Sequence, residues 1–115
     1  MQRERPAVRV YTDGSARAAE VLCEVLQGIE EEGIPYHTEH RENDASANAV
    51  AAAEESRLGT GIGISEGEVV VHYDKLPPGN PLFRVGTYEE NVNFRNLGSN
   101  AARLVKRIPF KQVGD

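Results

Sequence analysis

The 115-residue sequence has no tryptophan, one methionine and a single cysteine, and only 6% of its residues are aromatic. One cysteine excludes an internal disulfide and a cysteine-rich zinc site, and it fits a reducing compartment. Because aromatic residues are so few, the core must consist mainly of valine, isoleucine, leucine and alanine. A chain of this length with 39% hydrophobic residues has enough material for one ordinary domain.

Long apolar runs and an excess of positive charge are also missing. No stretch approaches the roughly 18 apolar residues of a membrane-spanning helix. Residues 1–6 are charged and polar with no apolar run behind them, so we expect a disordered tail and no secretory signal. The formal net charge of −5 argues against a nucleic-acid-binding or membrane-binding protein. We expect a cytoplasmic protein, and the acidic balance suits a partner with a basic patch or a bound cation.

Hydrophobic periodicity predicts five strands and three helices in the order β-α-β-α-β-β-β-α. The expected strands are 7–11, 36–39, 61–65, 68–72 and 82–85, and the expected helices are 16–32, 45–57 and a last one that ends near 108. The early βαβα alternation favours a mostly parallel sheet with helices on both faces. Glu66-Gly67 is a two-residue hairpin signal, so one strand enters antiparallel. We predict one α/β domain over residues 7–110 and a C-terminal tail, 111–115.

Local signals indicate where the helices begin. Ser15 or Asp13 is a suitable cap for the first helix, and Asn43 or Asp44 for the second. Thr87-Tyr88-Glu89-Glu90 matches a capping box, in which the threonine side chain would begin the last helix.

Three glycines lie inside predicted elements. Gly61 and Gly63 lack the further residues of a nucleotide-binding loop and lead into a hairpin, which favours close approach of a neighbouring helix. Gly98 lies inside the last helix, where it costs about 1 kcal/mol relative to alanine and usually has a packing reason.

No residue makes a strong case for catalysis. His37 and His40 point to opposite faces of a short strand, without the carboxylate spacing of a metal site. Cys23 lies off the apolar stripe of its helix, and no histidine partner for a catalytic thiol is evident. Asp13 occupies a position where α/β folds place ligand groups, yet it serves equally well in a turn. A stand-alone small-molecule-binding domain or enzyme, with Asp13 and Ser65 in a pocket, is therefore one alternative.

The last residues of the first helix break a local rule. Glu30, Glu31 and Glu32 stand where the helix dipole disfavours carboxylates, and they repel one another. Such violations are most frequent at functional sites, although a solvated charge run is the simpler interpretation. On a helical wheel Glu31 points away from the apolar stripe and is free to meet a cation or a basic partner. The candidate interaction surface is this helix end with Pro35 and Tyr36.

Four segments, in order, occur with the same spacing in one known family. They are Glu30-Glu31-Glu32-Gly33-Ile34-Pro35, Gly61-Ile62-Gly63-Ile64-Ser65 with its hairpin, Leu76-Pro77, and Leu97-Gly98-Ser99-Asn100-Ala101-Ala102-Arg103-Leu104-Val105-Lys106. Together they resemble the small subunit of the diol/glycerol dehydratase reactivases, and the match runs from about Ala7 to Phe110. The family is related to the medium subunit of adenosylcobalamin-dependent dehydratases. It has a three-layer α/β/α fold with a five-stranded mixed sheet. The segments around 48–55 and 84–93 do not match, which leaves a different partner open.

The resemblance implies a non-catalytic subunit, without a cofactor of its own, that works by exchange. In the family, the small subunit binds a large subunit with an actin-like ATPase. It then gives way to the medium subunit of a dehydratase that holds damaged cobalamin, and the cobalamin is released. A glutamate at the end of the first helix ligates the divalent cation of the large subunit, Mg²⁺ or Ca²⁺. Glu31 is the matching position here.

Several alternatives remain open at this point. The chain is also compatible with a structural, medium-type subunit of a dehydratase. The dehydratase partner, diol or glycerol, is undecided, as are association with a bacterial microcompartment and self-association of the isolated chain.

Overall fold

A computed structural model describes residues 5–113, and its element order is the predicted one. The strands are β1 (Val8–Thr12), β2 (Tyr36–His40), β3 (Thr60–Ile64), β4 (Glu68–Tyr73) and β5 (Phe83–Gly86); the helices are α1 (Ala16–Glu31), α2 (Ala45–Glu55) and α3 (Asn91–Lys106). The predicted tail at residues 1–6 falls largely outside the described residues, as do the last two residues of the tail predicted at 111–115. None of the helices within 5–113 has the length and apolar character needed to cross a bilayer.

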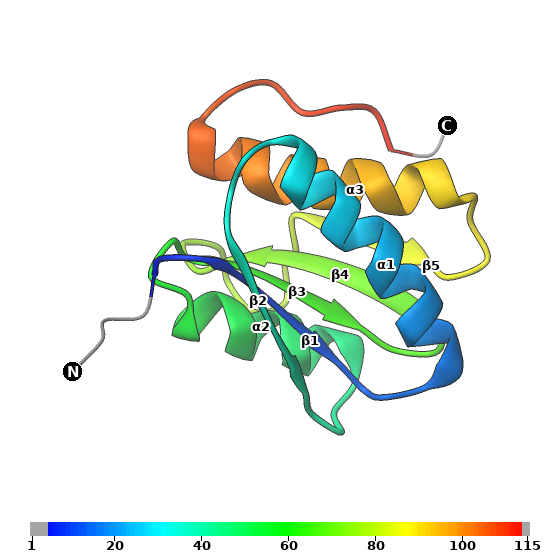
Figure 1. The fold of residues 1–115 in the computed structure, drawn as a ribbon. Coiled ribbons are helices and arrows are strands. Elements are labelled where there is room, and N and C mark those ends of the chain that lie inside the picture. The colour runs from blue at the N-terminus through cyan, green and yellow to red at the C-terminus, as the bar shows by residue number, and fades with distance from the viewer. Residues whose placement is uncertain (1–4, 114–115) are drawn as a thin grey trace.

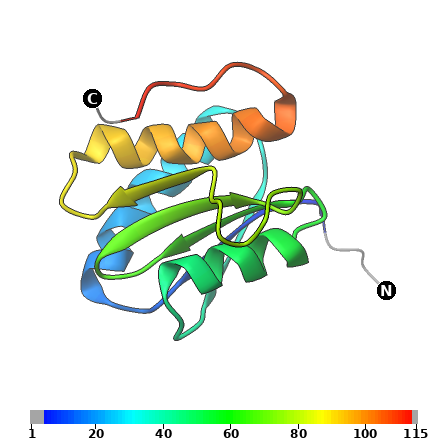
Figure 2. The same cartoon turned by 180° about the vertical axis from the view of Figure 1, so that it is seen from behind.

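The five strands form one sheet in the order β2-β1-β3-β4-β5. β1 pairs in parallel with β2 and β3, whereas β4 pairs antiparallel with β3 and β5. Only β4 therefore runs against the other strands, as the hairpin signal predicted. α1 and α3 cover one face of the sheet and α2 covers the other (Figures 1 and 2). The three-layer α/β/α fold is confirmed.

The larger part of the core lies between the sheet and the pair α1 and α3. Alternate residues of the strands point to this face, including Val8 and Val10 of β1 and Ile62 and Ile64 of β3. They meet apolar side chains of the two helices: Ala18, Val21, Val25, Ile29, Phe94, Leu97, Ala101 and Ala102. Burial of these residues fixes both helices on one side of the sheet.

α2 approaches the opposite face closely because both partners are small. A Cβ atom at Gly63 would lie 1.9 Å from the carbonyl oxygen of Ala45, and one at Gly61 would lie 2.2 Å from the amide nitrogen of Ala53. These distances confirm the prediction of close backbone approach. The same device joins α1 to α3, since a Cβ at Gly98 would lie 2.0 Å from the carbonyl oxygen of Val25.

The caps of α1 and α2 are as predicted, but that of α3 is not. Ser15 Oγ accepts a hydrogen bond from the Ala18 amide, and Asp44 Oδ1 accepts one from Ala47. α3 begins after Glu90, without a side-chain cap, so the prediction of a capping box at Thr87–Glu90 was wrong. The Thr87 hydroxyl instead donates to the carbonyl oxygen of Glu66, 2.5 Å away, and ties this loop to the β3–β4 hairpin.

Candidate functional site

The predicted interaction surface is a turn between the end of α1 and the start of β2. The amide of Glu32 bonds to the carbonyl oxygen of Ile29, and the amide of Gly33 bonds to that of Glu30. Gly33 has φ of +75°, the left-handed conformation that suits glycine after a helix. The chain then turns through Pro35 into β2. α1 ends beside the C-terminal end of α3 (Figure 1), so both helix ends contribute to this corner.

Glu32, the last of the three adjacent carboxylates, is bound by side chains of the protein itself. Its side chain is 9% exposed and accepts hydrogen bonds from Arg103 Nε at 3.0 Å and Lys106 Nζ at 2.8 Å. Lys106 Nζ also donates to the Glu32 carbonyl oxygen at 2.9 Å. The hydrogen bonds from Lys106 and Arg103 lower the pKa of Glu32, although burial opposes them. These two cations from α3 offset the negative end of α1.

Glu30 is engaged by the strand that follows the turn. The hydroxyl group of Tyr36 donates to Glu30 Oε1 at 2.8 Å, and this bond raises the pKa of Tyr36. The bond joins the last turn of α1 to the first residue of β2. Glu30 and Tyr36, which were both predicted to lie on the interaction surface, therefore contact each other.

Glu31 alone among the three carboxylates has no partner among the described residues. Its side chain is exposed, as the helical wheel predicted for a residue off the apolar stripe. The wheel did not distinguish the roles of Glu30 and Glu32. Their partners come from β2 and α3, and the bonds from α3 cross more than 70 residues of sequence.

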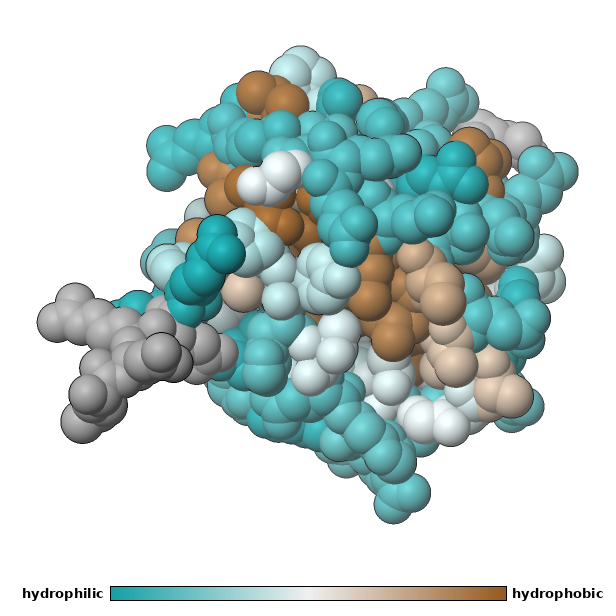
Figure 3. All heavy atoms as spheres, viewed as in Figure 1, coloured by the Kyte–Doolittle hydropathy of each residue, from teal (hydrophilic) through white to brown (hydrophobic). Residues whose placement is uncertain are grey.

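A depression of about 390 Å³ lies at this corner. It is lined by Arg5, Glu30, Gly33, Ile34, Pro35 and Tyr36. Three of these, Glu30, Pro35 and Tyr36, were predicted interface residues, whereas Arg5 had been assigned to the tail. Figure 3 shows that this side of the molecule is largely hydrophilic, with apolar residues in a band between the upper helices and the strands. The corner can therefore offer both charge and a concave surface to a partner.

The polar residues at the carboxyl ends of the strands serve turns. Asp13 Oδ1 accepts from the Ser15 amide at 2.9 Å and Oδ2 from the Glu66 amide at 3.1 Å. Burial would raise the pKa of Asp13, but these backbone hydrogen bonds outweigh it and lower the pKa. Ser65 Oγ accepts from the Glu68 amide at 3.2 Å. Both side chains are thus committed to the backbone of the loops that they connect.

The histidines on β2 have separate partners. His37 Nε2 lies 3.3 Å from Glu39 Oε2, and His40 Nε2 lies 3.2 Å from the carbonyl oxygen of Asp13. Within residues 5–113 no three His, Cys, Asp or Glu side chains are grouped closely enough to hold a metal ion. Cys23 is exposed on α1. A metal site at these residues would therefore need ligands that the described part of the chain does not supply.

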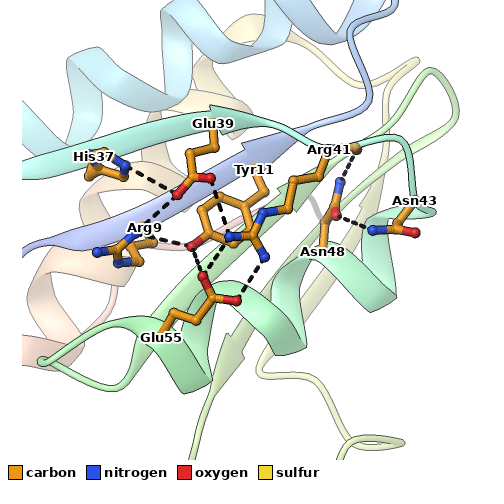
Figure 4. Close-up of polar contacts among 8 residues, drawn as sticks. All are labelled: Arg9, Tyr11, His37, Glu39, Arg41, Asn43, Asn48 and Glu55. Carbon is orange, nitrogen blue, oxygen red and sulfur yellow. Dashed lines mark hydrogen bonds and ion pairs between the residues drawn. The ribbon is translucent and has the colours of Figure 1, made fainter.

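A second polar cluster covers the α2 side of β1 and β2 (Figure 4). The hydroxyl of buried Tyr11 donates to Glu55 Oε1 at 2.7 Å, and Arg41 binds both oxygens of Glu55 at 2.6 and 2.7 Å. Arg41 also stacks 4.1 Å above the Tyr11 ring and reaches Glu39, which in turn binds Arg9 at 3.2 Å. Sequence analysis missed this cluster because its members are scattered along the chain. Its charges neutralise one another, which indicates a structural role.

Comparisons with known proteins agree with the fold and place the chain in a family. The model of the dehydratase medium subunit family matches residues 5–111. The chain is 44% identical over 108 residues to the propanediol dehydratase-reactivating factor small subunit of Citrobacter freundii, covering 93% of this chain and 91% of that one. It is 46% identical over 96 residues to the protein of the same name from Salmonella typhimurium, covering 83% of each. A structure of diol dehydratase-reactivating factor complexed with ADP and Mg²⁺ contains a chain that superposes with a TM-score of 0.88 at 40% identity. The match covers 95% of this chain and 100% of that one.

Proposed function

The chain belongs to the family of dehydratase medium subunits and dehydratase-reactivating factor small subunits, and from this membership we propose that it is the small, non-catalytic subunit of such a reactivating factor. In this proposal it binds a larger ATPase subunit. It then exchanges with the medium subunit of an adenosylcobalamin-dependent diol or glycerol dehydratase, so that damaged cobalamin is released. It acts in the cytoplasm, either free or associated with a bacterial microcompartment.

The observation that carries this proposal is the distinct state of Glu31. Its neighbours Glu30 and Glu32 are occupied by Tyr36 and by the cations of α3, whereas Glu31 is exposed and has no partner within residues 5–113. A carboxylate at the negative end of a helix is unfavourable unless a cation compensates it. The cations of α3 bind Glu32 and not Glu31, so an external cation or basic group would supply that compensation for Glu31.

A divalent cation fits Glu31 as one ligand in a shared site. Carboxylate oxygens are the usual ligands of Mg²⁺ and Ca²⁺, and Mg²⁺ commonly takes only one or two of them from a protein. The described residues contain no group of three potential ligands, so the ion would be held mainly by the partner. The related factor that was solved with ADP and Mg²⁺ supports this choice of ion. When bound, the cation would link the two subunits.

The test is the affinity of this chain for the large subunit of its reactivating factor, measured by calorimetry in Mg²⁺ and in EDTA. We expect Glu31→Gln to weaken binding in Mg²⁺ by about tenfold or more, because loss of a group that only supports a metal ligand already costs about 10–100-fold. Glu20→Gln is the matched control, because Glu20 is an exposed carboxylate on the same helix, with a side chain that is 68% exposed. Equal affinities for the two variants would refute a role for Glu31 in a shared cation site.

A second candidate function is a structural, medium-type subunit of a dehydratase. It is favoured by the description of the matching family, which is that of the dehydratase medium subunit. The two functions predict different stable partners. Copurification with an ATPase subunit that is displaced by added dehydratase would support the reactivating role. Stable copurification with a cobalamin-containing dehydratase and no ATPase would support the structural role.

A further inference from the structure

The end of α1 is held in place by residues of α3 that do not belong to the proposed interaction surface. Arg103 and Lys106 bind the carboxylate of Glu32, and Lys106 also binds its carbonyl oxygen. One turn earlier the backbones of the two helices touch, since a Cβ at Gly28 would lie 1.9 Å from the carbonyl oxygen of Arg95. Ser99 Oγ donates to the Gly28 carbonyl oxygen at 3.2 Å. These contacts bind the last turns of α1 to α3.

We propose that Glu32, Arg103 and Lys106 form a clamp that positions Glu31 for its partner. This inference rests on the proposed function of Glu31 and adds three positioning residues to it. None of the three needs to touch the partner. The clamp acts through the backbone of the last turn of α1, which carries both Glu31 and Glu32.

The physical reason lies in the weakness of helix ends. The last turn of a helix frays readily, and three adjacent carboxylates at its negative end favour fraying. Arg103 and Lys106 remove this tendency, because they bring two positive charges and occupy a carbonyl group that the helix leaves without a partner. Glu31 is then presented from an ordered turn. A ligand that is already ordered binds a cation without a further loss of conformational entropy.

The three adjacent carboxylates of this corner are thereby in different states. Glu32 is bound by two cations, Glu30 accepts from Tyr36, and Glu31 is exposed without a partner among residues 5–113. The clamp withdraws Glu32 from solvent and leaves Glu31 as the carboxylate that a partner can reach. Without the clamp, Glu32 would be a further exposed carboxylate beside Glu31.

The test is a double-mutant cycle between Glu31 and Glu32, read out as affinity for the large subunit in Mg²⁺. We expect Glu32→Gln to weaken binding by about tenfold, as residues that support a metal ligand do. Glu31→Gln should weaken binding as described above, and the double variant should be no weaker than Glu31→Gln alone, because a positioning residue has no effect once its ligand is gone. In EDTA, Glu32→Gln should bind as the wild type does. Hydrogen exchange of the amides of residues 30–33 should accelerate in Glu32→Gln.

Glu24→Gln is the matched control. Glu24 also joins α1 to α3, through Arg95 Nη2 at 2.8 Å, but it lies two turns before the corner. Its loss should leave Mg²⁺-dependent binding unchanged. The proposed clamp is overturned if Glu31→Gln weakens binding while Glu32→Gln does not, or if the effects of the two substitutions simply add. If Glu31→Gln itself has no effect, the proposed function fails, and the clamp fails with it as a positioning device.

Discussion

At the scale of single residues, Glu55 makes a prediction about acid stability. Hydrogen bonds from Arg41 and Tyr11 lower the pKa of Glu55 from 4.5 to about 2. Because the folded-state pKa is below the unfolded one, this interaction stabilises the protein above about pH 4.5 and is lost as the pH falls towards 2. In Glu55→Gln the unfolding free energy should therefore fall less steeply than in the wild type as the pH is lowered from 4.5 towards 2. Since the side chain is 41% exposed, its contribution at pH 7 should be only about 1 kcal/mol.

Urea unfolding at a series of pH values between 2 and 7 measures this effect. Glu54→Gln is the control, because Glu54 is exposed on the same helix and makes no ion pair within residues 5–113. In that variant the unfolding free energy should fall with pH as steeply as in the wild type. An equally steep fall in Glu55→Gln would contradict the role assigned to the hydrogen bonds of Glu55.

Sequence reasoning reached the orientation of Glu31 but not the states of its neighbours. Helical periodicity shows which way a side chain points from its own helix, and this was sufficient for Glu31. The partners of Glu32 come from α3, and the acceptor of the Tyr11 hydroxyl comes from α2, 44 residues away. No local pattern contains such pairings, because they depend on how the helices dock on the sheet.

At the scale of elements, the contact between α2 and β3 makes the second prediction. Gly63→Ala adds a methyl group where a Cβ would lie 1.9 Å from the Ala45 carbonyl oxygen, so α2 must shift away from the sheet. Overpacking of this kind typically costs about 1–3 kcal/mol, and we expect the upper part of this range. The measurement is the midpoint of urea unfolding.

Gly67→Ala provides the matched control for this substitution. Gly67 lies in the turn between β3 and β4, and a Cβ there would have no atom within 4 Å. A surface change of this kind usually stays within about 0.5 kcal/mol. If Gly63→Ala were no less stable than Gly67→Ala, then α2 would not be packed against the glycines of β3 as described.

The types of the elements could be predicted because each has a strong local signal. The cap of α3 could not be predicted, because it depends on a tertiary contact. The three helices have long apolar stripes or many alanines. The strands are short runs of alternating character that lie between turn residues. Thr87 has the right spacing for a capping box, but the β3–β4 hairpin brings the Glu66 carbonyl oxygen within reach of its hydroxyl. A tertiary hydrogen bond thus replaced the local one that the sequence pattern suggested.

At the scale of the whole molecule, the order of elements restricted the possible topologies of the sheet, but it did not predict the path of the residues that follow α3. A βαβαβ start with one hairpin leaves few topologies, and the observed order β2-β1-β3-β4-β5 is among them. The residues after α3 carried no such signal. Residues 108–113 run back along α3 (Figure 1), and Phe110 packs edge-on against Phe83 of β5 with ring centroids 5.4 Å apart.

The last prediction concerns this C-terminal segment. Asn100 is fully buried, and its side chain donates to the Lys111 carbonyl oxygen at 2.8 Å and accepts from the Lys111 amide at 2.6 Å. Deletion of residues 111–115 would leave both polar atoms of the amide without these partners, at a cost of about 1–3 kcal/mol. We expect a corresponding loss in the unfolding free energy measured in urea. The domain boundary predicted at residue 110 implies instead that the deletion has little effect.

A loss of stability on deletion could come from the unsatisfied Asn100 amide or from other contacts of residues 111–115. Asn100→Leu separates these two explanations. Leucine has the same branching and the same number of side-chain heavy atoms as asparagine but no amide to satisfy, so deletion of 111–115 in this background should cost less than it does in the wild type. An equal cost in both backgrounds would mean that Lys111 stabilises the fold without Asn100. The difference between the two costs therefore measures how strongly the buried amide joins the last described residues to the domain.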